Sequence, residues 1–129
     1  MLTIVNRYRP VNLALWTIRF PVTAMISITH RVTGVLLFLL LPVLLWSLEQ
    51  TLHSPESFIH WQDCFKNAAF RLFLWAALST LFYHLIAGIR HLLMDFHLGE
   101  SKQGGRCGAY IVIVVSTIAA VTLGVWLWS

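Results

Sequence analysis

The histidine at position 84 is the residue whose type and place in this 129-residue chain most suggest chemistry. It lies in an apolar run six residues before Arg90, which in a helix places the imidazole roughly 9 Å deeper than the guanidinium. An ionisable group at that depth usually has a function, and imidazole is a common axial ligand of haem iron. We therefore predict that His84 binds a haem. The alternative is a histidine that is hydrogen-bonded to a neighbouring helix.

Small residues surround His84 on its helical face. Gly88 follows at i+4 and Ala87 at i+3, which leaves room for a flat porphyrin or, alternatively, for close packing of helices. A six-coordinate haem needs a second ligand on the opposite face of the ring. His91 shares the face of His84, so the candidates are His30 and a histidine from another subunit.

A second polar cluster contains Ser27, His30 and Arg31, at i, i+3 and i+4 of one helical face. An arginine suits the carboxylates of haem propionates, and Ser27 with Arg31 could hydrogen-bond a quinone carbonyl. The alternative is that Arg31 extends to the lipid headgroups and that Ser27 bonds back to its own helix.

The residues that follow His84 are also polar. Arg90 and His91 are followed one turn later by Asp95. They could bind propionates, lipid phosphates or the underside of a soluble partner. For Arg90 alone, a solvated positive flank is the simpler interpretation, and Asp95 could belong to a proton path.

Three apolar segments must position these side chains. They run over approximately 22–48, 68–94 and 107–128, each long enough to cross a bilayer as a helix. Of the whole chain, 58% is hydrophobic and 11% is charged, against about 25% charged in a soluble domain. We predict an all-α integral membrane protein, one domain of residues 1–129 with three transmembrane helices.

The basic residues predict the orientation, because cytoplasmic loops carry an excess of Lys and Arg. Seven of the nine precede or open the first span or lie between the second and third spans, and only Lys66 and Arg71 lie on the other side. We expect a cytoplasmic N-terminus and a periplasmic C-terminus in a bacterial inner membrane. The same distribution argues against nucleic acid as a partner and for membrane lipid.

Three further features have structural meaning. Pro42 should kink the first span, and residues 12–20 could lie along the interface as an amphipathic segment or form an ordered loop. Ser116, Ala120 and Gly124 form a small-residue face that suggests association with another helix.

The two cysteines, Cys64 and Cys107, fall at opposite ends of the spans and cannot form an intrachain disulfide. We find no hydrolytic triad, phosphate loop, zinc motif, dinucleotide fingerprint or iron–sulfur cysteine set in the sequence. Any electrons must therefore come from another protein.

Specific motifs now suggest a family. They are Arg9-Pro10-Val11, Ser27-x-x-His30-Arg31-x-Thr33, His84-x-x-x-Gly88-Ile89-Arg90-His91 and Met94-Asp95. Together with the three spans, they resemble the cytochrome b membrane-anchor subunit of succinate dehydrogenase, the larger of the two anchors of complex II.

The resemblance implies roles for several residues. His84 matches the haem b axial ligand, with the other histidine supplied by a second, smaller anchor subunit. His30 and Arg31 match residues near the haem propionates, and Ser27 and Arg31 match the ubiquinone site. The family has a small residue two positions after its acidic Asp95, where this chain has His97.

The resemblance also implies the partners and the reaction. A flavoprotein subunit would oxidise succinate, an iron–sulfur subunit would pass electrons to the membrane, and this chain, not catalytic alone, would help to deliver them to ubiquinone. The alternatives are an anchor of fumarate reductase, running the opposite reaction with menaquinone, and a structural anchor without a cofactor. The sequence contains no internal repeat and no pair of broken helices that would indicate a transporter subunit.

Overall fold

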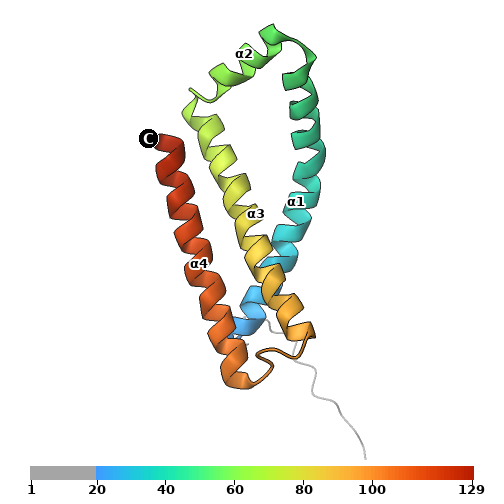
Figure 1. The fold of residues 1–129 in the computed structure, drawn as a ribbon, viewed down its shortest axis with the longest axis vertical. Helices are drawn as coiled ribbons and strands as arrows, with labels where there is room; N and C mark the ends of the chain where they lie inside the picture. The colour runs from blue at the N-terminus through green and yellow to red at the C-terminus, as the bar shows by residue number, and fades with distance from the viewer. Residues whose placement is uncertain (1–19) are drawn as a thin grey trace, which may run out of the picture.

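The computed structural model describes residues 20–129, and the helices of this part are joined by short turns (Figure 1). Its helices are α1 (Val22–His53), α2 (Pro55–Cys64), α3 (Ala68–Asp95) and α4 (Lys102–Trp128). The three long ones are long and apolar enough to cross a membrane, which confirms the predicted all-α architecture with three candidate spans. The motif at residues 9–11 and almost all of the segment 12–20 lie outside the described residues.

The long helices extend further than their apolar segments. The first was expected to end near residue 48 but continues to His53, and α4 begins at Lys102 instead of near 107. Ser54 ends α1 because it precedes Pro55, which disfavours helical backbone at the residue before it. Ser101 begins α4 by accepting a hydrogen bond from the Gly104 amide. Hydropathy therefore predicts the part of each helix that is long and apolar enough to cross a bilayer, whereas capping residues determine where the helix begins and ends.

A short helix, α2, occupies part of the segment between the first two predicted spans. Ser54 caps it by accepting from the Ser57 amide at 3.1 Å, and Pro55 is at its first position. Glu56 lies in the first turn, where hydrogen bonds from a backbone amide and from the Ser54 hydroxyl lower the pKa of its carboxyl group. These residues are ordinary signals for the start of a helix, but a search for apolar segments does not detect so polar a helix.

The central helix of the molecule is α3, which packs against both α4 and α1 (Figure 1). The best-buried apolar side chains are Ile26, Ala87, Ala109 and Val112, one or two from each long helix. Because Ile26 lies near the start of α1 and Ala109 near the start of α4, this small core lies at the end that we expect to be cytoplasmic.

The other end of the bundle is more open. Pro42 lies inside α1, which continues through it and diverges from α3 in its outer half (Figure 1). The short α2 helix bridges the gap, and an aromatic cavity of about 440 Å³ lies beneath it, lined in part by Trp46, Trp61 and Phe70.

The small-residue face of α4 packs within the chain. Trp75 of α3 donates from Nε1 to the Ala120 carbonyl at 2.8 Å, and a side chain added at Gly124 would lie 3.4 Å from the same indole nitrogen. The helix that this face was expected to meet is therefore α3.

The turn between α3 and α4 contains His97, at the position where the resemblance led us to expect a small residue. His97 has a φ of 62°, in the left-handed region that favours glycine. Its Nδ1 lies 2.9 Å from the Glu100 carboxylate, a contact that helps to hold this conformation.

Candidate functional site

The imidazole of His84 is oriented by α1. Its Nδ1 lies 3.1 Å from the His30 carbonyl oxygen and 3.1 Å from the Thr33 hydroxyl, which itself donates to the same carbonyl. A carbonyl can only accept, so Nδ1 carries the proton and the neutral ring has its lone pair at Nε2. Among residues 20–129, Nε2 has no hydrogen-bond partner. In metal-binding histidines, the ring nitrogen that does not bind the metal is usually held by a hydrogen bond, for example to a backbone carbonyl. The imidazole of His84 therefore fits an axial haem ligand.

Three histidines stack at this place. The His30 ring lies between the other two, with centroids 4.1 Å from His84 and 4.8 Å from His91 and interplanar angles of 18° and 19°. Two axial ligands of one haem instead point their nitrogens at the iron from opposite faces of the porphyrin. The stacked arrangement therefore excludes His30 as the partner ligand of His84 within this chain.

Two glycines make the stack possible. A Cβ at Gly34 would lie 3.1 Å from Cε1 of His84, and one at Gly88 would lie 3.4 Å from Nε2 of His30. Ala87 is fully buried in the core. The space beside Gly88 is thus filled by His30, so close helix packing, the alternative to a porphyrin gap, accounts for these small residues.

The predicted quinone residues, Ser27 and Arg31, lie on α1 beside His30 but are not part of the stack. Arg31 is exposed and Ser27 is half-buried on α1. Within the described part of the chain the Ser27 hydroxyl makes no hydrogen bond, whereas Thr29 and Thr33 of the same helix bond back to backbone carbonyls. Neither side chain is therefore engaged by another group of residues 20–129, which is compatible with binding of a ligand or another subunit.

The burial of Arg90 was missed by the sequence analysis. Its side chain is only 8% exposed and donates from Nη2 to the Gly105 carbonyl at 3.1 Å. A Cβ at Gly108 would lie 3.3 Å from its Nε, so the guanidinium packs across the glycines of α4. The interpretation of Arg90 as a solvated flank is wrong. The sequence feature that could have predicted this burial is the spacing of Gly105 and Gly108, because two glycines three residues apart leave a gap between the side chains of α4.

The polar residues beyond Arg90 differ in their surroundings. His91 Nδ1 lies 2.7 Å from the Ala87 carbonyl, which orients the ring in the stack. Asp95 ends α3, is exposed, and pairs with no basic group of the described residues.

Fold and site together define a class: a helical membrane protein with three candidate spans and an oriented histidine that fits a haem ligand. The comparison with protein families narrows this. Residues 5–123 match the family described as succinate dehydrogenase/fumarate reductase transmembrane subunit. The chain belongs to this family, among the cytochrome b anchor subunits of succinate dehydrogenase.

Several relatives carry the name succinate dehydrogenase cytochrome b556 subunit. The one from Coxiella burnetii is 47% identical over 95% of this chain and 99% of its own length. Those from Paracoccus denitrificans and Rickettsia felis are 31% and 30% identical, each over 91% of both chains.

Proposed function

We propose that the chain anchors a succinate dehydrogenase in a bacterial inner membrane, binds haem b and forms part of the ubiquinone-reduction site. Electrons would reach it from an iron–sulfur subunit that a flavoprotein subunit reduces. The observation that carries the proposal is the orientation of His84, whose Nδ1 is held by α1 so that Nε2 is free to bind iron.

In this proposal His84 would hold haem b together with a histidine of a smaller anchor subunit, because His30 is stacked on the His84 ring. Arg31 is exposed and suits a propionate. Nε2 of His30 is buried against Gly88, so its contact with a propionate would use Nδ1. When bound, the haem would supply a one-electron redox centre.

Ser27 and Arg31 are one helical turn apart on α1. A hydroxyl and a guanidinium at this spacing can hold one carbonyl oxygen of ubiquinone and stabilise the negative charge that develops on it during reduction. The remaining contacts would come from the iron–sulfur subunit and the smaller anchor. The exposed Asp95 is a candidate for supplying protons from the aqueous phase.

The first test is a reduced-minus-oxidised absorbance spectrum of the complex purified through a tag on this chain. We expect a b-type haem band in the wild type and in His60→Leu, a control on the exposed surface of α2, and its loss or shift in His84→Leu. A wild-type complex that contains its soluble partners but no haem band would contradict the proposal and leave a haem-free anchor.

The second test separates a quinone site from a purely structural anchor. Hydrogen bonds to charged groups are worth about 1.5–3 kcal/mol, so Arg31→Ala should lower quinone reduction on the order of ten- to a hundredfold. Ser27→Ala should lower it less. Both complexes should still assemble. Unchanged quinone reduction in both variants would favour the structural anchor.

An anchor of fumarate reductase is a second candidate, because the family description covers both enzymes. The relatives from Coxiella burnetii and Rickettsia felis are named for succinate dehydrogenase. Comparing succinate oxidation by ubiquinone with fumarate reduction by menaquinol in the purified complex would distinguish the two.

A further inference from the structure

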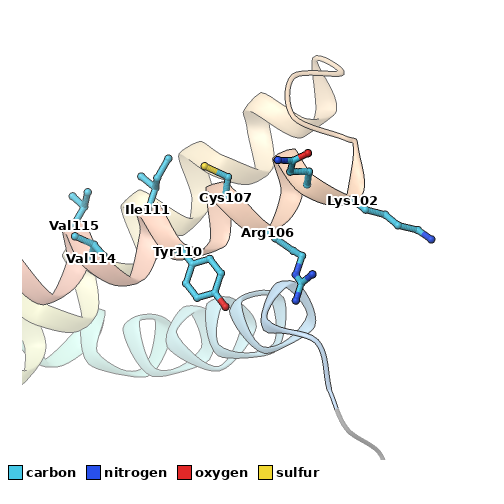
Figure 2. Close-up of a pocket in the computed structure, with 8 residues that line it drawn as sticks. Lys102, Arg106, Cys107, Tyr110, Ile111, Val114 and Val115 are labelled. Carbon is cyan, nitrogen blue, oxygen red and sulfur yellow. The ribbon is translucent and has the colours of Figure 1, made fainter.

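A groove of about 870 Å³ runs along the first half of α4 (Figure 2). Lys102 and Arg106 line it at its beginning, followed by Tyr110 and then by Ile111, Val114 and Val115. Figure 2 shows Arg106 and Tyr110 extending from one side of the helix and Cys107 and Ile111 from the other. The groove is thus the space between two neighbouring rows of side chains spaced four residues apart.

The two cations at the beginning of this groove form no ion pair with an acidic residue of their own chain. All five acidic residues of the sequence fall within the described part, and the ion pairs there are Asp63 with Lys66 and Glu100 with His97. The beginning of a helix also favours an anion, because the helix dipole is positive there. Lys102 and Arg106 therefore suit a negatively charged ligand.

The remainder of the groove is apolar and exposed on the surface of the chain. Tyr110, Ile111 and Val114 are each more than half exposed. From Lys102 to Val115 the helix rises about 20 Å, which matches the thickness of one leaflet including its headgroups, about 20–22 Å. A soluble protein would meet the two cations but would not reach the apolar part.

We propose that this groove binds one anionic phospholipid. Its phosphate lies between Lys102 and Arg106, the phenol of Tyr110 lies at the boundary between headgroup and hydrocarbon, and an acyl chain follows Ile111, Val114 and Val115. The site is separate from the histidine stack, so it does not depend on haem or quinone binding.

The test is native mass spectrometry of the complex purified from its membrane, with added phosphatidylglycerol or phosphatidylcholine. Wild type should retain phosphatidylglycerol in preference to phosphatidylcholine. Each cation near an anionic headgroup contributes about 1 kcal/mol, so Lys102→Gln with Arg106→Gln should weaken phosphatidylglycerol binding about thirtyfold. Lys66→Gln with Arg71→Gln removes the same charges at the other end of the spans and should leave binding unchanged.

A second pair of variants tests the apolar part without changing any charge. Ile111→Trp fills the groove and should lower the occupancy of phosphatidylglycerol. Ile118→Trp, at an exposed position of the same helix beyond the groove, should not. Equal retention of both lipids by wild type, or unchanged binding in the Lys102/Arg106 variant, would overturn the proposal. So would loss of a soluble subunit from that variant with the lipid retained, since the two cations would then dock a protein.

Discussion

The ring of His84 is confined on several sides by groups of α1. Its Nδ1 bonds to the His30 carbonyl, its face stacks on the His30 ring, and Cε1 lies against Gly34. Each contact depends on a neighbour of a particular type, and a ring held in this way has little freedom to move. The site is therefore sensitive to a change of one methyl group.

We expect Gly34→Ala to destabilise the protein. Alanine normally stabilises a helix by about 1 kcal/mol relative to glycine, but here its Cβ would lie 3.1 Å from Cε1 of the confined ring. Overpacking of this kind costs about 1–3 kcal/mol, so the free energy of unfolding should fall or at best stay level. Thermal unfolding of the purified protein measures this.

Gly124→Ala is the matched control, because its Cβ would make an ordinary contact at 3.4 Å with Trp75. This variant should be as stable as wild type or more stable. A Gly34→Ala protein that gains as much stability as Gly124→Ala would show that the His84 ring is free to move.

Arg90 stabilises the molecule through packing and one hydrogen bond. We expect Arg90→Ala to lower the free energy of unfolding by about 2 kcal/mol, because it leaves a cavity between α3 and the glycines of α4. Lys66→Ala, at an exposed position, should change it by less than about 0.5 kcal/mol. Equal unfolding of both variants in a denaturation series would mean that the cavity closes without cost.

At the scale of the elements, the helix ends are set by capping and by proline. The segment Pro55–Cys64 forms α2 although its composition is polar, because Ser54, Pro55 and Glu56 satisfy or complement the first-turn amides. The apolar runs predicted α3 within one residue of its end but missed the last residues of α1 and the first turn of α4.

Ser54→Ala tests this account of α2. Loss of an N-cap costs about 1 kcal/mol, so amide hydrogen exchange in the first turn of α2 should accelerate about fivefold. Ser47→Ala is the control, since that hydroxyl bonds back to the Leu44 carbonyl within α1 and caps no helix. Unchanged exchange at Ser57 in the Ser54→Ala protein would contradict the capping role.

At the scale of the whole molecule, the inner end is closed and the outer end is open. The buried residues Ile26, Ala87 and Ala109 join all three long helices near the beginning of α1, whereas α1 and α3 diverge toward α2. The histidine stack lies at the closed end, where three helices restrict its geometry.

The orientation of this bundle remains a prediction from the basic residues. We expect alkaline phosphatase fused after Ser129 to be active in the periplasm and the same enzyme fused within residues 96–101 to be inactive, because seven of the nine Lys and Arg residues lie at the same end of the spans as that loop. Activity of the loop fusion without activity of the C-terminal fusion would reverse the topology.

The sequence by itself was enough to predict a membrane environment, the three spans and the polar residues that are suited to chemistry. Apolar segments of about 20 residues predict membrane helices without reference to neighbours, and His84, Ser27 and Arg31 stand out because polar groups in such segments are costly.

Only the tertiary structure decided which of these side chains meet. The stacking of His30 on His84, the burial of Arg90 against Gly105 and the use of Ala120 by Trp75 each join residues more than ten positions apart. Helical periodicity relates residues three or four positions apart on one helix. The crossing angle and register of α1 and α4 on α3 arise from packing between helices, which the sequence does not encode locally.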